Sequence, residues 1–119
     1  MATRVREVMT AEPHTLPSST SLSDAAREMR DADIGSVIVT ESGSICGIVT
    51  DRDIVVRAIA RGMNPLETPL SAVCPREPMT LSPEQEVDEA AYLMRMRGIR
   101  RLPVEENGRP VGIVSLGDL

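Results

Sequence analysis

The chain contains two similar stretches of nine residues, CGIVTDRDI at residues 46–54 and VGIVSLGDL at residues 111–119. Each stretch passes from a β-branched apolar run to a hydroxyl residue and then to an aspartate three residues later. A β-branched run favours a strand, and Ser/Thr-x-x-acid spacing is typical of a helix N-terminus. The two stretches therefore predict a strand that leads directly into a helix, twice.

The similarity extends well beyond these stretches. A shift of 65 residues aligns Pro13 with Pro78 and Asp53 with Asp118 without a gap, and 17 of the 47 positions in residues 8–54 are identical to their partners. This is an internal duplication. A repeat of about 50 residues is too small to bury its own apolar faces well, so we expect the two repeats to share one core with approximate two-fold symmetry.

The apolar pattern changes period in the same order in both repeats. A short extended segment, residues 13–16 or 78–81, comes first. A helix with one apolar face follows, and its apolar positions are Leu22, Ala25, Ala26 and Met29 in the first repeat and Val87, Ala90, Ala91 and Met94 in the second. Two β-branched runs come next, residues 36–40 and 45–50 or 101–105 and 110–115, with hairpin signals at Gly43 and at Asn107-Gly108.

A second helix closes each repeat. In the first repeat this helix is predicted from Asp51 to Arg61, and Gly62 is expected to end it. In the second repeat the helix only begins, at Asp118, before the sequence ends. The predicted fold is therefore mixed α/β, with two β-α-β-β-α repeats related by pseudo-two-fold symmetry. The first repeat spans residues 1–62, a linker with two prolines spans 63–70, and the second repeat, with a truncated last helix, spans 71–119.

Composition excludes several classes of function. The chain of 119 residues has a net charge of −5, one Tyr and neither Phe nor Trp, which argues against a nucleic-acid partner. No apolar run is long enough to span a membrane and the N-terminus lacks a signal-peptide pattern, so we expect a cytoplasmic protein without a membrane partner. Cys46, Cys74 and the single His14 lack ligand spacing, which predicts no metal site and two buried, reduced thiols.

No set of residues suggests catalysis. Neither a Ser-His-Asp nor a Cys-His arrangement is visible, and Asp53 and Asp118 recur as single carboxylates rather than as a pair. We therefore expect no enzyme activity, no catalytic residue and no cofactor.

The repeated hydroxyl and aspartate allow two interpretations. Thr50 with Asp53, and Ser115 with Asp118, have the spacing of a helix cap, in which the hydroxyl satisfies a free backbone N–H group. Alternatively, free N–H groups at a helix start bind phosphate, and a nearby carboxylate accepts hydrogen bonds from two vicinal hydroxyls. Together, such groups are suited to a ribose phosphate.

These motifs, taken together, resemble the CBS domain, a family whose members normally occur as tandem pairs. The resemblance covers nearly the whole chain, from VREVM at residues 5–9 through GIVTDRD at 47–53 to IRRLPV at 99–104 and GIVSLGD at 112–118. The tract TDRDIVVRAIARGMNP, residues 50–65, is similar to small stand-alone bacterial members of the family. The resemblance implies a regulatory module that binds adenosine-containing ligands, such as AMP, ADP, ATP or S-adenosylmethionine, in two clefts between the repeats.

The resemblance also implies which residues line the clefts. In each cleft an aspartate would hold the ribose hydroxyls and the neighbouring Ser or Thr would assist, while the other repeat completes the site. Cleft 1 would contain Thr50, Asp53, Thr80, Arg100, Arg101 and the backbone around Pro103. Cleft 2 would contain Thr15, Ser36, the backbone around Ile38, Ser115 and Asp118.

The two clefts are expected to differ. Arg100 and Arg101 of cleft 1 can donate charge-assisted hydrogen bonds to phosphate, whereas Gly35 and Ser36 occupy the matching positions of cleft 2. The chain also ends one residue after Asp118, where the first repeat continues for two more helical turns. Either cleft 2 is poorly formed or the natural chain is longer.

Family members commonly form flat dimers through their helices, and the apolar side chains proposed for a homodimer here are Ile54, Val55, Val56, Ile59 and Met96. The regulated partner protein is not indicated. One alternative is a structural dimerisation module whose Thr/Ser-x-x-Asp motifs only cap helices. Another is an oxidation-sensitive protein that uses Cys46 and Cys74, which the core-like matching positions Val111 and Met9 disfavour.

Overall fold

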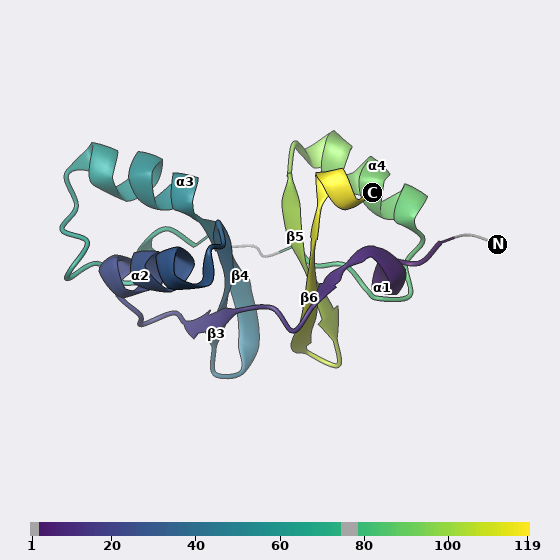
Figure 1. Cartoon of the computed structure of the whole chain (residues 1–119), viewed down its shortest axis with the longest axis horizontal. Helices are drawn as coiled ribbons and strands as arrows, with labels where there is room; N and C mark the ends of the chain where they lie inside the picture. Colours follow the sequence, from purple (N-terminus) through teal and green to yellow (C-terminus); the bar gives the residue numbers. More distant parts are fainter. Residues whose placement is uncertain (1–2, 75–78) are drawn as a thin grey trace. The chain divides into compact units, whose positions relative to one another are not determined.

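The computed structural model describes residues 3–74 and 79–119, and the chain forms two compact units (Figure 1). The first unit consists of His14–Pro78, and the second joins Met1–Pro13 to Met79–Leu119. Each unit contains a three-stranded sheet and a long helix. The predicted mixed α/β repeat is confirmed.

The sheet of the first unit has the order β2-β3-β4. Strand β2 (Thr15–Pro17) runs parallel to β3 (Ser36–Glu41), and β3 forms an antiparallel hairpin with β4 (Ser44–Thr50). The helix α2 (Leu22–Ala32) connects β2 to β3. This is the crossover that a parallel pair of strands requires.

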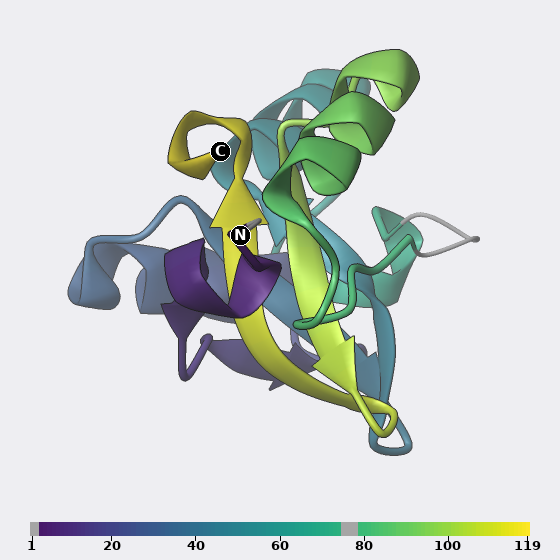
Figure 2. The same cartoon turned by 90° about the vertical axis from the view of Figure 1, so that its right-hand side faces the viewer.

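The sheet of the second unit has the order β1-β6-β5. Strands β5 (Arg101–Glu106) and β6 (Arg109–Ser115) form the hairpin, and α4 (Val87–Arg97) lies beside it (Figure 2). The short helix α1 (Val5–Val8) and strand β1 (Thr10–Ala11) come from the start of the chain. Of the extended segment predicted at 78–81, Leu81 forms a parallel bridge with Val104, and Pro78 lies outside the described residues.

Both hairpins turn through two residues of positive φ. Ser42 and Gly43 have φ of 53° and 82°, and Asn107 and Gly108 have φ of 54° and 79°. Two consecutive positive φ angles fit a type I′ turn, whose twist matches that of the strands. The predicted hairpins are thus confirmed. Each hairpin also contains a bulge, where the register shifts after Val39 and after Val104.

The apolar faces of the two long helices pack on their hairpins. Leu22, Ala25 and Met29 are buried in the first unit, and Ala90 and Met94 in the second. The prediction for Ala26 was wrong, because its side chain is exposed. Helix α2 ends at Asp33 in the left-handed conformation, and α4 ends in the same way at Gly98.

The second helix of the first repeat forms as predicted and stops at Gly62, which has a φ of 76°. It is not a uniform α-helix, because an α-helical turn, α3 (Asp51–Asp53), is followed by a π-helical segment (Ile54–Ala58) and a 3-10 turn (Ile59–Arg61). The second repeat has only the 3-10 turn Leu116–Asp118.

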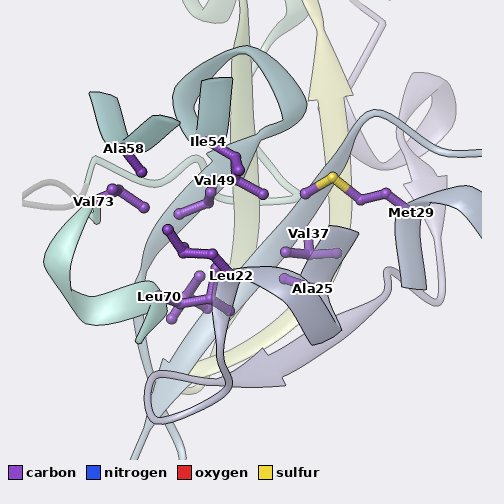
Figure 3. Packing of buried hydrophobic residues seen from close by; sticks show 10 residues of the cluster. Leu22, Ala25, Met29, Val37, Val49, Ile54, Ala58, Leu70 and Val73 are labelled. Carbon is purple, nitrogen blue, oxygen red and sulfur yellow. The ribbon is translucent and has the colours of Figure 1, made fainter. Parts of the chain in front are cut away.

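A short segment from the start of each repeat, around Val5 or around Leu70, completes the core of the unit that contains the hairpin of the other repeat. Val5 is fully buried in the second unit, and Leu70 is fully buried in the first, where Val73 packs beside it (Figure 3). Equivalent backbone hydrogen bonds hold both segments: Val5 N–H donates to Gln85 O at 2.8 Å, and Leu70 N–H donates to Thr20 O at 2.8 Å.

The compact units therefore do not coincide with the repeats read from the sequence, 1–62 and 71–119. Residues 63–70, assigned to a linker, are also held in place: Leu22 N–H donates to Thr68 O, and Ser23 N–H donates to Pro65 O. Burial of apolar side chains such as Leu70 outweighs proximity in sequence in deciding which unit each segment joins.

We predict that Gly112→Ala destabilises the second unit. A Cβ atom on Gly112 would lie 2.5 Å from Met9 Sδ and 3.1 Å from Thr10 O, so the Met9 side chain would have to change its conformation and the β1 backbone would have to shift slightly away from β6. Overpacking of this kind costs about 1–3 kcal/mol. Chemical denaturation followed by circular dichroism measures the loss.

Gly117→Ala is the matched control, because the nearest atom to its Cβ would be Ser115 Oγ at 3.9 Å. Equal stability of the two variants would contradict the close approach of β1 at Gly112.

Candidate functional site

The end of β4 positions the first hydroxyl and aspartate. Thr50 N–H donates to Asp53 Oδ2 at 2.9 Å, and Asp53 N–H donates to Thr50 Oγ1 at 3.1 Å. Both side chains are partly buried. This reciprocal arrangement is a capping box, so the cap predicted from the spacing is present.

One oxygen of the Asp53 carboxylate remains available. Oδ2 accepts the Thr50 N–H bond, whereas Oδ1 forms an ion pair with Arg57 Nε at 3.7 Å, which is longer than a good hydrogen bond. The Asp53 side chain is 27% exposed. A carboxylate oxygen can accept more than one hydrogen bond, so Asp53 can cap the helix and still accept bonds from a ligand.

The second repeat has a related but different arrangement. Ser115 N–H donates to Asp118 Oδ2 at 2.9 Å, and Ser115 Oγ donates to the same oxygen at 3.0 Å. Asp118 is exposed, unlike Asp53. The hydroxyl of Ser115 therefore donates a hydrogen bond to the carboxylate of Asp118.

A backbone hydrogen bond joins each helix start to the beginning of its hairpin. Asp51 N–H donates to Gly35 O at 3.0 Å, and Leu116 N–H donates to Arg100 O at 2.7 Å. These carbonyls have equivalent positions in the repeats, which an alignment of the repeats could have indicated. They fix the loop residues before β3 and β5 beside the capping motifs.

The other predicted residues lie near these junctions within each unit. In the first unit Ser36 is opposite Thr50 across the hairpin, and Thr15 pairs with Ile38 between β2 and β3. Ile38 is fully buried, so it can offer a ligand only its backbone groups.

In the second unit Arg101 is opposite Ser115 across the hairpin. Arg100 and Arg101 are both exposed, and neither forms an ion pair within residues 3–74 and 79–119. Pro103 is buried and its carbonyl accepts the N–H of Leu81 at 3.0 Å, next to the partly buried Thr80.

Each unit thus brings together residues of both predicted clefts. Thr50 and Asp53 of cleft 1 share the first unit with Thr15, Ser36 and Ile38 of cleft 2. The second unit holds the remaining members, which are Thr80, Arg100, Arg101, Pro103, Ser115 and Asp118. The assembly of each cleft from the two halves stays a prediction.

Within the described part of the chain, no three His, Cys, Asp or Glu side chains gather closely enough to hold a metal ion. In the same part, no helix has the length and apolar character needed to cross a membrane.

A pair of hairpins, each followed by a capped helix and each completed by the leading segment of the other repeat, defines a tandem-repeat α/β protein. The CBS domain profile matches residues 5–59 and again residues 70–119. The chain therefore belongs to the CBS domain family and is a tandem CBS domain pair.

Known proteins of similar length share this organisation. The CBS domain-containing protein YhcV of Bacillus subtilis is 36% identical over 115 residues, which cover 97% of this chain and 81% of that protein. A CBS-domain containing protein from Agrobacterium tumefaciens has a structure with a TM-score of 0.84 and 32% identity, over 99% of this chain and 91% of the other. Hypoxic Response Protein I, solved with two coordinated zinc ions, gives a TM-score of 0.88 and 29% identity, with 98% and 95% coverage.

We predict that Thr50→Ala lowers the free energy of unfolding by about 0.5–2 kcal/mol, because Asp53 N–H loses its capping acceptor. Urea denaturation followed by circular dichroism measures this. Thr50→Ser keeps a hydroxyl and should stay close to wild type. A Thr50→Ser variant as unstable as Thr50→Ala would show that packing of the Thr50 methyl group, and not the cap, carries the effect.

Proposed function

We propose that this CBS pair is a regulatory module that senses an adenosine-containing ligand, such as AMP, ADP, ATP or S-adenosylmethionine. The observation that carries the proposal is the partly buried carboxylate of Asp53, whose Oδ2 is oriented by the Thr50 N–H bond and whose Oδ1 has a long ion pair with exposed Arg57. A fixed carboxylate suits two vicinal ribose hydroxyls, because both are donors and the carboxylate only accepts. No catalytic step is proposed.

Cleft 1 is the proposed nucleotide site. Arg100 and Arg101 are exposed and can form charge-assisted hydrogen bonds with phosphate oxygens, which Arg does with bidentate geometry. Thr80 and the backbone around Pro103 complete this half. The adenine ring would pack on aliphatic side chains and backbone amides, since the chain has no Phe or Trp.

Cleft 2 is proposed to be weaker and to suit a nucleoside with less phosphate charge. Its half in the first unit contains Thr15, Ser36 and Ile38, none of which is cationic. Its carboxylate, Asp118, is exposed and accepts two bonds from Ser115 through one oxygen. Exposure to water weakens any hydrogen bond that Asp118 makes to a ligand.

Ligand-dependent thermal unfolding tests the proposal. We expect one of AMP, ADP, ATP, NAD or S-adenosylmethionine to raise Tm by several degrees, because a ligand at about 100 times its Kd adds about 2.7 kcal/mol. Far-UV circular dichroism reports the transition. Asp53→Asn should abolish the shift with little change in basal Tm, since an amide oxygen can still accept the Thr50 N–H bond but the group loses its charge and one acceptor.

Asp24→Asn is the matched control, because Asp24 is also a first-turn aspartate in the first unit and is exposed beside Arg27. It should keep the full ligand shift. Arg101→Ala should reduce the shift more for ADP and ATP than for S-adenosylmethionine. Unchanged Tm of a folded wild-type protein with all five ligands would reject sensing and favour the purely structural pair.

A homodimer is the second part of the proposal, and an exposed apolar stripe supports it. Val55, Val56 and Ile59 of the helical segment 51–61 are 57%, 49% and 47% exposed. Met96 of α4 is 66% exposed. Ile54, which was also expected on this surface, was assigned wrongly, because its side chain belongs to the core of the first unit. Val55, Val56 and Ile59 of the first unit form an exposed apolar cluster by themselves, and such clusters mark protein interaction surfaces.

We predict that Val55→Asp, by placing a charge in the apolar stripe, shifts a dimer toward monomer at micromolar concentration. Sedimentation equilibrium measures the association constant. Arg61→Glu is the control, because Arg61 is exposed near the end of the same helical segment but outside the stripe. A monomeric wild type, or equal weakening by both variants, would refute the assignment of this surface.

A further inference from the structure

The two cysteines of the chain pack against the same hydrophobic cluster of the first unit, although 27 residues separate them in sequence. Both thiols are free and both side chains are only partly buried, which corrects the expectation of two buried thiols.

The bulge in β4 explains why Cys46 is accessible to Cys74. Val39 pairs with Gly47 and Thr40 pairs with Ile45, so Cys46 is the extra residue without a cross-strand partner. The extra residue of a bulge is re-aimed relative to the regular ladder. Cys74 follows Val73, which anchors the incoming segment in the core of the same unit.

In the second unit, the residue that matches Cys74 lies next to the residue that follows the match of Cys46. Met9, the repeat partner of Cys74, places its sulfur 2.5 Å from where a Cβ atom on Gly112 would lie. Gly112 directly follows Val111, the repeat partner of Cys46. The side chain at position 9 or 74 therefore extends toward the bulge of its hairpin.

Burial, more than charge, slows oxidation of the Cys74 thiol at rest. Burial raises the pKa of Cys74, and the adjacent Cys46 side chain and the carboxylates of Asp53 and Glu41 raise this pKa further. The thiolate is the reactive form, so a raised pKa slows oxidation at neutral pH.

We propose that Cys46 and Cys74 form a reversible intramolecular disulfide, which makes the bulge of β4 a redox modification site. With a peroxide as oxidant, one thiol attacks and breaks the O–O bond, which gives a sulfenic acid and one water. The second thiol then displaces the hydroxyl group as a second water and forms the S–S bond. Two thiols are oxidised and one peroxide is reduced. A dithiol reductant reverses the step.

Mass spectrometry of the wild-type chain tests this directly. The protein is treated with hydrogen peroxide, the remaining thiols are alkylated, and the chain is digested with trypsin without reduction. Cleavage at Arg52, Arg57 and Arg61 places the two cysteines in different peptides. We expect the linked pair of peptides, a chain that stays monomeric in mass and lighter by two hydrogens, and recovery of both thiols with dithiothreitol.

The rate provides a second readout. Disulfide formation should accelerate from about pH 7 to about pH 9, because the raised pKa of Cys74 leaves little Cys74 thiolate at neutral pH. Cys46→Ser and Cys74→Ser should each stop at singly oxidised species. Independent oxidation of the two wild-type thiols, or linked peptides found only in covalent dimers, would overturn the proposal. The wild-type digest decides the matter even where a serine variant fails to fold.

Discussion

Each compact unit depends on apolar side chains that come from the leading segment of the other repeat. Val5 completes the core of the second unit, and Leu70 and Val73 complete that of the first. The backbone bonds from Val5 to Gln85 and from Leu70 to Thr20 are equivalent under the repeat. A hairpin and one helix leave part of their apolar surface exposed, and this added segment covers it. Sheet order, register and hairpin geometry all rest on that closed core.

The carboxylates proposed to bind a ligand lie at the edge of the apolar core, where a strand leads into a helix. A hairpin bonded to the start of the next helix, through Gly35 O or Arg100 O, fixes the strand-to-helix junction in both units. The carboxylates of Asp53 and Asp118 sit at these junctions and cap their helices. Capping and ligand binding are therefore compatible uses of one residue, because a cap occupies only one carboxylate oxygen. The second repeat reproduces the bond from the backbone N–H to the carboxylate, while its hydroxyl bonds differently and the neighbouring residues differ in charge and exposure.

Most of the fold could be predicted from local sequence patterns. Helices α2 and α4, both hairpins and the stop at Gly62 follow from apolar spacing and turn residues. The capping motifs were also predictable, since they depend on residues three positions apart. Features that depend on long-range packing were not predictable. No local signal shows that Leu70 of the expected linker joins the core of the first unit, that the Ile54 side chain is buried, or that Cys46 is the extra residue of a bulge. The helix end at Asp33 was equally hidden, because the usual sequence signal for a left-handed helix end is a glycine.

The exchanged segments also bear on how such a chain can arise. A single repeat would present a hairpin whose core lacks its covering segment, together with a leading segment that fits the core of another repeat. Two separate copies would satisfy both needs by trading these segments, as in a domain-swapped dimer. Joining the two copies in one chain keeps the exchange of segments but makes it intramolecular, and therefore independent of protein concentration. Duplication then frees each half to diverge, which accounts for arginines at positions 100 and 101 where the first repeat has Gly35 and Ser36.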